Sequence, residues 1–246
     1  EVTVWVKSRL KKLGVSADVQ VVSALKGYGF PELASWIEAH QPKLLVTGVT
    51  NVGKSHVISR LLSMRLGRKG GASVKPTVSA YPGTTVSWSK WSLAGGSQLA
   101  DSPGFVPQGR LSDMLCASCA QELIPNRNLS SRLFPLTTGG LMHIPGRAAV
   151  LCREAGERGV LLGYCGSGVN WERSNQRNLA KWTTDFGGHC PIREWEQHQV
   201  VLPRNHDLLI HGLGWVSARN ATYQLTIHLH QGVEFTIRPC LVGPKS

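Results

Sequence analysis

The sequence predicts an α/β fold over residues 1–109 and a β-rich fold toward its end. Residues 43–47 form an apolar run of strand length, and a glycine-rich octapeptide and a helical pattern follow it directly. Residues 223–230 alternate between apolar and polar side chains with period two, which is typical of a strand. Between these ends, further short apolar runs separated by glycine-rich turns indicate more strands.

Each element of the first part has its own signal. Residues 19–22 (Val-Gln-Val-Val) and 43–47 (Lys-Leu-Leu-Val-Thr) are predicted strands, the second of them buried. One helix is predicted over 30–40, where a proline stands near the start, and another over 54–66, whose apolar side chains share one face. A short strand is predicted to end at Ala100. We expect these strands to form a mostly parallel sheet.

The octapeptide at residues 48–55 reads Gly-Val-Thr-Asn-Val-Gly-Lys-Ser, which is the spacing of a P-loop. In this spacing, backbone amides and the Lys54 ammonium cradle the β- and γ-phosphates of a nucleotide, and the Ser55 hydroxyl reaches Mg²⁺. The helix that follows points its N-terminus at the phosphates. The predicted nucleotide-binding residues of this loop are Thr50, Asn51, Val52, Gly53, Lys54, Ser55 and His56.

Two further motifs follow in the order that a P-loop nucleotide hydrolase requires. Pro-Gly-Thr-Thr at 82–85 offers hydroxyls to Mg²⁺ and the γ-phosphate, and Asp-Ser-Pro-Gly at 101–104 offers a carboxylate and a glycine amide. Each motif alone occurs by chance, but three in order predict a nucleotide-binding fold. The predicted Mg²⁺ ligands are Ser55, Thr84, Thr85 and Asp101, and the predicted catalytic residues are Lys54, Thr85 and Gly104.

Of the two motifs that recognise the nucleotide base in GTPases, the sequence contains one. The sequence lacks an Asn-Lys-x-Asp motif, whose carboxylate pairs with the guanine ring edge, so GTP and ATP both stay open at this point. The companion base-contacting turn is present as Ser23, Ala24 and Leu25. The missing motif would lie a few residues before Glu1, which is not an initiator methionine, and we therefore expect the N-terminus to be cut or unresolved rather than guanine recognition to be lacking.

A base-contacting turn that precedes the P-loop resembles the order found in circularly permuted GTPases. Within that class the chain resembles the YqeH family, most strongly at 208–216 and 231–238 and more weakly at 133–136 and 139–141. The resemblance implies a GTPase that uses GTP/GDP and Mg²⁺ in assembly of the small ribosomal subunit. Its implied partners are the subunit precursor, rRNA and ribosomal proteins. Its implied location is an organelle, the mitochondrial matrix before the plastid, with the bacterial cytoplasm as the alternative.

One feature of the family is missing, and one residue bears on activity. The family's N-terminal zinc finger, a pair of Cys-x-x-Cys elements, has no counterpart in this sequence. Phe105 stands where many GTPases place a glutamine that orients the attacking water. Because phenylalanine cannot hydrogen-bond a water, we expect slow intrinsic hydrolysis. Asn51 matches the asparagine that binds K⁺ in GTPases with a hydrophobic residue at that position, which makes K⁺ a further expected cofactor; alternatively, Asn51 only shapes the loop.

The charge of the chain is consistent with an RNA partner. The sequence has 27 Lys and Arg against 15 Asp and Glu, a formal net charge of +12, which favours encounters with phosphate backbones. One basic cluster lies at residues 7–12 and a second lies on the segment leading to Thr84. Either cluster alone is also compatible with an ordinary solvated face. The residues that we expect to contact RNA are Arg65, Arg68, Lys69 and Lys75.

The chain is long enough for more than one domain, and we expect three parts. These are a permuted core over 1–109, a mixed α+β connector over 110–198, and a β-rich domain over 199–246. In the family the last part resembles the trp RNA-binding attenuation protein. The connector has predicted strands at 148–152 and 160–164, joined by a glycine turn.

The cysteines have a plain explanation. Cys116 and Cys119 form a lone Cys-x-x-Cys, and His189 and Cys190 lie too far along the sequence to complete a zinc site. We therefore interpret the cysteines as reduced structural thiols.

The remaining features favour an assembly factor over other classes. His228 and His230 share one face of a predicted strand, which we interpret as a solvated or RNA-facing surface rather than a metal site. No segment resembles a transmembrane span, a secretory signal or the motifs of a nucleophilic hydrolase or kinase, and nothing indicates a homo-oligomer. The expected function is a GTP-binding, slowly hydrolysing factor; the alternative is an RNA-binding scaffold with a vestigial or purely structural nucleotide site.

Overall fold

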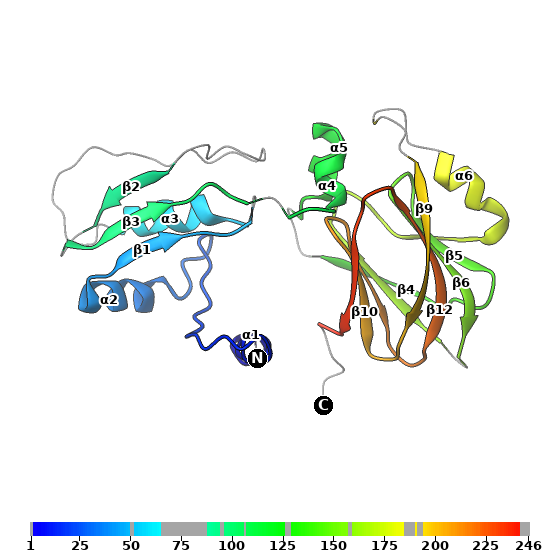
Figure 1. Cartoon of the computed structure of the whole chain (residues 1–246), viewed down its shortest axis with the longest axis horizontal. Helices are drawn as coiled ribbons and strands as arrows, with labels where there is room; N and C mark the ends of the chain where they lie inside the picture. Colours follow the sequence, from blue (N-terminus) through cyan, green and yellow to red (C-terminus); the bar gives the residue numbers. More distant parts are fainter. Residues whose placement is uncertain are drawn as a thin grey trace. The chain divides into compact units, whose positions relative to one another are not determined.

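The structure is a computed structural model in which the chain forms two compact units, Glu1–Pro107 and Gln108–Ser246 (Figure 1). It describes residues 2–49, 52–64, 88–93, 96–105, 107–125, 129–156, 159–184, 190 and 194–241. The expected fold class, an α/β core followed by a β-rich part, is confirmed.

The first unit is a small mixed sheet with helices. Its elements are α1 (Val2–Lys12), α2 (Phe30–His40), β1 (Lys43–Val46), α3 (Lys54–Ser63), β2 (Ser89–Ser92) and β3 (Gln98–Asp101). The strand order is β1-β3-β2 (Figure 1). The pair β1–β3 is parallel and places Val46 opposite Asp101, whereas β3–β2 is antiparallel. The described sheet is therefore mixed, not mostly parallel as expected.

The core of this unit packs helices α2 and α3 against the sheet. Apolar residues three or four apart put one stripe of each helix inward, as the helical period requires. The buried residues of this core are Phe30, Ala34 and Ile37 of α2, Ile58 and Leu61 of α3, and Leu93 and Leu99 of the strand region.

Two expectations for this unit were wrong in detail. Residues 19–22 are not a strand, since no described strand forms a hydrogen-bonded ladder with them. Strand β1 is not buried: it alternates between exposed and half-buried positions, and Leu45 is 55% exposed. A run of apolar side chains predicts neither which strand will pair with it nor which side chains will bury it, because both come from segments far away in the sequence.

The second unit is built almost wholly from antiparallel strands. Its first elements are α4 (Leu111–Met114), α5 (Ala117–Leu123), β4 (Ser130–Phe134), β5 (Gly140–Ile144), β6 (Ala148–Ala155), β7 (Leu161–Cys165), β8 (Glu172–Asn175), η2 (Gln176–Asn178) and α6 (Leu179–Thr184). The strands that follow are β9 (Trp195–Leu202), β10 (His206–Ile210), β11 (Gly214–Ala218), β12 (Tyr223–His230) and β13 (Phe235–Pro239).

These strands form two five-stranded sheets, β13-β10-β11-β7-β4 and β8-β5-β6-β12-β9. One hydrophobic cluster takes side chains from both, for example Leu161 and Val216 from the first sheet and Val150 and Ile227 from the second. The two sheets are thus the walls of a single sandwich core.

The expected division of this part at residue 198 does not appear in the structure. Strand β7 pairs with β11, and β6 pairs with β12, so each sheet combines strands from both sides of that boundary. The predicted strands 148–152 and 160–164 do exist as β6 and β7, but they belong to different sheets. Strands far apart in the sequence pair here, and patterns of neighbouring residues do not predict such pairing.

Strand β12 lies in the middle of its sheet between β6 and β9. His228 and His230 are 3% and 1% exposed, so the interpretation of a solvated or RNA-facing surface was wrong. A central strand of a sandwich is covered by neighbours along its edges and by side chains on its faces, and period-two alternation does not distinguish this from a half-exposed strand. Among the described helices, none combines the length and apolar character that crossing a bilayer requires.

Candidate nucleotide-binding site

The P-loop connects the end of β1 to the start of α3. Its backbone turns at Gly48 (φ 149°) and at Gly53 (φ 96°), which immediately precedes the helix. Both positions lie in the left-handed region, where a side chain with a Cβ is strained. The two glycines of the Gly-x4-Gly-Lys-Ser pattern are therefore required by the path of the backbone, and Lys54 and Ser55 open α3 as expected.

The Lys54 ammonium is held on the carbonyl oxygens of its own loop. Its Nζ donates to Gly48 O (3.0 Å) and to Val49 O (2.8 Å). The loop thus folds back around a positive charge, and Ser55 beside it is half-buried. A phosphate oxygen offers this ammonium a stronger, charge-assisted acceptor than a neutral carbonyl does.

Asp101 lies at the end of β3 that faces the P-loop. Parallel pairing sets it opposite Val46, the last residue of β1, and Ser102 N–H donates to Val46 O (3.0 Å). Asp101 is only 2% exposed, and its Oδ1 has no hydrogen-bond partner among the described residues. Burial raises the pKa of Asp101, and the Lys54 charge partly offsets that rise.

These observations fit the predicted Mg²⁺ site. A buried carboxylate oxygen without a donor costs free energy unless a cation or a proton reaches it. Hard carboxylate and hydroxyl oxygens are the ligands that Mg²⁺ prefers. Asp101 and Ser55 are the described residues that would hold the ion.

The Asp-Ser-Pro-Gly segment continues the contact between β3 and the P-loop. Beyond Gly104, Phe105 forms a parallel bridge with Val49, and its N–H donates to Gly48 O (3.3 Å). The Phe105 side chain is 56% exposed. Phe105, which stands where many GTPases have a glutamine, is therefore anchored to the P-loop by its backbone, while its ring extends toward solvent.

The predicted base-contacting turn is a hydrogen-bonded loop next to α3. Gly27 N–H donates to Ser23 O (2.7 Å), and Ser23 N–H donates to Tyr28 O (2.9 Å). Ala24 packs against the core of the unit, whereas Leu25 is 92% exposed. A Cβ on Gly27 would lie 2.5 Å from the Arg60 side chain, so this turn meets the helix that begins at the P-loop. The structure brings the two predicted nucleotide-binding segments into one unit.

Other predicted site residues are not all placed. Val52 and His56 are exposed. The predicted site residues that lie outside the described part of the chain are Thr50, Asn51, Thr84 and Thr85 of the nucleotide site and Arg65, Arg68, Lys69 and Lys75 of the RNA cluster.

One group of chemistry-bearing residues was missed. Cys190 lies beside Cys116 and Cys119, with all three sulfur atoms within 4.8 Å of one another. The sequence contained the Cys-x-x-Cys signal, but the third cysteine is 74 residues from Cys116, and only folding brings it there.

The P-loop between β1 and α3 and the buried Asp101 at the end of β3 have the arrangement expected of a P-loop nucleotide-binding site. A sequence model of the family described as "50S ribosome-binding GTPase" matches residues 43–126. The chain is also 27% identical over 252 residues to "Uncharacterized protein YqeH" of Bacillus subtilis (strain 168), covering 97% of this chain and 68% of that protein. Together these similarities support the YqeH-type family that the motif order indicated.

Proposed function

We propose that this chain is a GTP-binding, slowly hydrolysing assembly factor for the small ribosomal subunit that binds rRNA or a precursor particle in its GTP state. The observation that carries the nucleotide part is the buried Asp101 carboxylate at the strand end that faces the P-loop, whose Oδ1 has no hydrogen-bond partner in the described part of the chain. The ribosomal part is supported by similarity to YqeH over 97% of the chain and by the motifs quoted above.

The described residues have distinct roles in hydrolysis. Lys54 moves its hydrogen bonds from the loop carbonyls to phosphate oxygens and stabilises the negative charge of the transition state. Ser55 and Asp101 orient the metal, which when bound neutralises charge on the β- and γ-phosphates. The Gly104 amide lies on the segment that Phe105 ties to the P-loop and is available to the γ-phosphate.

Slow turnover follows from Phe105. Its ring has no polar atom that could position the attacking water, so the intrinsic rate depends on another group. We assign that role to K⁺ held with the help of Asn51, or to a partner on the ribosomal particle. Thr84 and Thr85 complete the Mg²⁺ and γ-phosphate contacts in this proposal.

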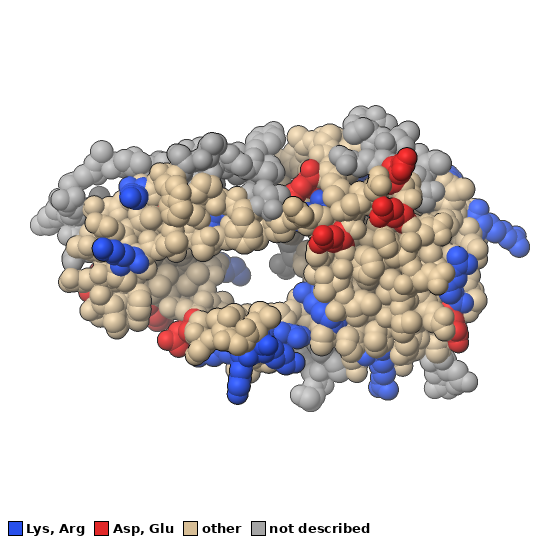
Figure 2. Space-filling view, in the orientation of Figure 1, with Lys and Arg blue, Asp and Glu red and all other residues tan. Residues whose placement is uncertain are grey.

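A basic surface suits binding to rRNA. Helix α1 has no buried residue, and Lys7, Lys11 and Lys12 on it are exposed. Figure 2 shows Lys and Arg side chains gathered over this helix. Together with the +12 net charge, they favour a phosphate backbone as the partner. The second cluster, Arg65 to Lys75, is the other proposed RNA contact.

The location that we propose is an organelle, the mitochondrial matrix before the plastid, with the bacterial cytoplasm as the alternative. This part of the proposal rests on the family resemblance. Import of a tagged full-length protein, scored by fractionation, tests it.

Sedimentation with ribosomal precursors tests the function. The protein is mixed with small-subunit precursors and, separately, with large-subunit precursors, in the presence of a non-hydrolysable GTP analogue, GDP or no nucleotide. We expect enrichment on the small-subunit precursor with the analogue only. Enrichment on the large-subunit precursor would redirect the proposal to the activity named for the matching family, and equal binding in all three states would favour the scaffold alternative.

Two variants sharpen this experiment. Lys54→Ala removes the phosphate-binding ammonium, and a GTP-gated factor then loses its enrichment, whereas a scaffold keeps it. Lys90→Ala, an exposed lysine on β2, is the matched control for the loss of one positive charge.

A further inference from the structure

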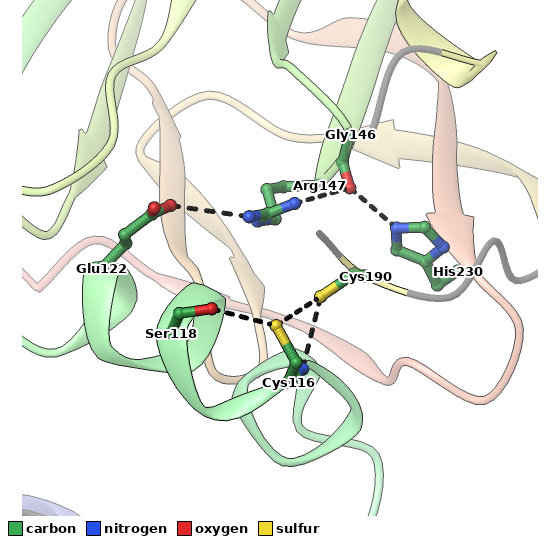
Figure 3. Close-up of polar contacts among 7 residues, drawn as sticks. All are labelled: Cys116, Ser118, Glu122, Gly146, Arg147, Cys190 and His230. Atoms are coloured by element: carbon green, nitrogen blue, oxygen red, sulfur yellow. Dashed lines mark hydrogen bonds and ion pairs between the residues drawn. The ribbon is translucent and has the colours of Figure 1, made fainter. Parts of the chain in front are cut away.

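Three cysteines of the second unit converge on one point. Cys116 immediately precedes α5, Cys119 lies in its first turn, and Cys190 comes from the segment between α6 and β9. Their sulfur atoms all lie within 4.8 Å of one another, and the Cys116 and Cys190 sulfurs are 3.2 Å apart (Figure 3). No other group of three potential metal ligands lies so close together in the described part of the chain.

Two of the three cysteines are buried, Cys116 is half-buried, and polar groups contact their sulfur atoms. Cys119 and Cys190 are 3% and 9% exposed, and Trp195 packs against them. Cys116 N–H donates to Cys190 Sγ (3.3 Å), and the Ser118 hydroxyl lies 3.2 Å from Cys116 Sγ (Figure 3). Donors to sulfur favour the thiolate, which is the form that binds metal.

A cation lies near the cluster. Arg147 is 5% exposed, and its guanidinium forms an ion pair with Glu122 at 3.5 Å (Figure 3). The charge of Arg147 also acts on Cys119.

We propose that Cys116, Cys119 and Cys190 bind one Zn²⁺ ion as a structural site. Three thiolates and Zn²⁺ have a net charge of −1, and the nearby Arg147 guanidinium, which is also paired with Glu122, reduces the cost of burying that charge. Thiolate sulfur is the preferred ligand of zinc in structural sites, which have four ligands. The described residues supply three; His189, next to Cys190 in the sequence, lies outside them. The site is separate from the family's N-terminal zinc finger, whose paired Cys-x-x-Cys elements have no counterpart in this sequence.

Zinc bound at this site would hold together two segments that lie far apart in the sequence, those that contain Cys116 and Cys190. The residues between Cys116 and Cys190 include five strands, and bringing their ends together costs loop-closure entropy. Metal binding would offset that cost and hold the start of α5 to the segment that leads into β9. The proposal therefore predicts a metal-dependent stability of the second unit.

The first test uses the unchanged 246-residue chain, purified under reducing conditions and loaded with Zn²⁺. We expect one bound equivalent by elemental mass spectrometry. We also expect slow alkylation of Cys116, Cys119 and Cys190 that becomes fast after a chelator, as read by peptide mapping. Cys240, outside the cluster, is the internal control, and its rate does not depend on the chelator. Absence of bound zinc, or alkylation of the cluster that ignores the chelator, overturns the proposal.

Variants then locate the ligands. Replacement of zinc by Co²⁺ gives a thiolate-to-cobalt charge-transfer band and the intense visible bands of tetrahedral cobalt. Cys116→Ser, Cys119→Ser and Cys190→Ser each remove one equivalent of metal and weaken these bands, whereas Cys152→Ser, a buried cysteine on β6, leaves both unchanged. If the ligand variants fail to fold, the alkylation experiment decides. If the protein that was purified under reducing conditions and loaded with Zn²⁺ nevertheless contains a Cys116–Cys190 disulfide, the proposal is contradicted.

Discussion

The backbone N–H of Phe105 donates a hydrogen bond to the carbonyl oxygen of Gly48, with 3.3 Å between the two atoms. Gly48 opens the P-loop, and Phe105 follows the motif that contains Asp101. Lys54 donates to the same carbonyl oxygen. One acceptor is therefore shared by Lys54, the proposed phosphate-binding residue, and by the segment that carries Asp101, the proposed metal ligand. A phosphate that draws Lys54 away would change the hydrogen bonding of both.

The variant Asp101→Asn separates two effects of the buried carboxylate: the loss of stability that its burial causes and its proposed role in binding Mg²⁺. Burial raises the pKa of Asp101 above its ordinary value of 3.8, so the folded state holds a proton that the unfolded state has already lost. Stability contributed by this group is present below pH 3.8 and is lost as pH rises through the raised pKa. At neutral pH, without nucleotide and Mg²⁺, we expect Asp101→Asn to unfold at a higher temperature than the wild type.

The same variant should gain no stability from Mg²⁺ and GTP, unlike the wild type. Thermal unfolding with and without the ligands measures both effects. Asp18→Asn, an exposed carboxylate of the same unit, is the control. An Asp101→Asn variant that is stabilised by Mg²⁺ as strongly as the wild type would rule out the proposed metal role.

Lys54→Ala should weaken nucleotide binding sharply. Hydrogen bonds to charged groups contribute about 1.5–3 kcal/mol, which corresponds to roughly a 10- to 100-fold increase in Kd. Titration with a fluorescent GTP analogue measures the change, and Lys90→Ala should bind as the wild type does. Wild-type affinity in Lys54→Ala would show that this lysine does not contact phosphate.

Potassium should accelerate hydrolysis relative to sodium. The expected effect is on the order of tenfold, equivalent to about 1.4 kcal/mol of barrier, because a bound cation replaces part of the stabilisation that Phe105 cannot supply. Phosphate release at equal ionic strength in KCl and NaCl measures it. Asn51→Ala should make the two rates equal, and equal rates in the wild type would remove the cation role from Asn51.

Mild acid should destabilise the second unit. Burial lowers the pKa of His143 and of His228 below the ordinary value of 6.5, and the Arg153 charge lowers that of His228 further. As pH falls through 6.5, the unfolded chain takes up protons that the folded chain does not, so stability is lost progressively. Thermal unfolding between neutral and mildly acidic pH should show a falling midpoint.

His228→Gln should reduce that pH dependence, because glutamine does not titrate. His206→Gln, a half-buried histidine on β10, serves as the control for loss of an imidazole in the same unit. A pH profile of His228→Gln that matches the wild type would exclude His228 as a contributor.

Gly163→Ala should destabilise the second unit by about 1–3 kcal/mol through overpacking. A Cβ at Gly163 would lie 2.7 Å from the ring of the buried Trp171 and 3.0 Å from Met142. Chemical denaturation measures the change. The nearest atoms are Cδ1 and Cγ of Trp171, so the effect should shrink in a Trp171→Ala background, and equal effects in both backgrounds would show that this side chain is not the obstacle.

Several parts of the site could be predicted from the sequence because they are local. The glycine spacing of the P-loop specifies backbone conformations within eight residues, and the structure has Gly48 and Gly53 in the left-handed region. Helix α2 over 30–40 and helix α3 from Lys54 follow from the spacing of apolar side chains around a helix. Asp101 is the last residue of β3, the parallel pairing of that strand with β1 places it opposite Val46, and the Lys54 charge acts on its carboxylate.

The sequence by itself thus determined the class of site, because that chemistry is written in short motifs whose geometry is set by neighbouring residues. Only the tertiary structure decided which strands share a sheet, why His228 is buried, and that Cys190 joins Cys116 and Cys119. Each of these depends on contacts between residues far apart in the chain. Such contacts form when the whole unit buries its apolar surface, and no local pattern specifies them.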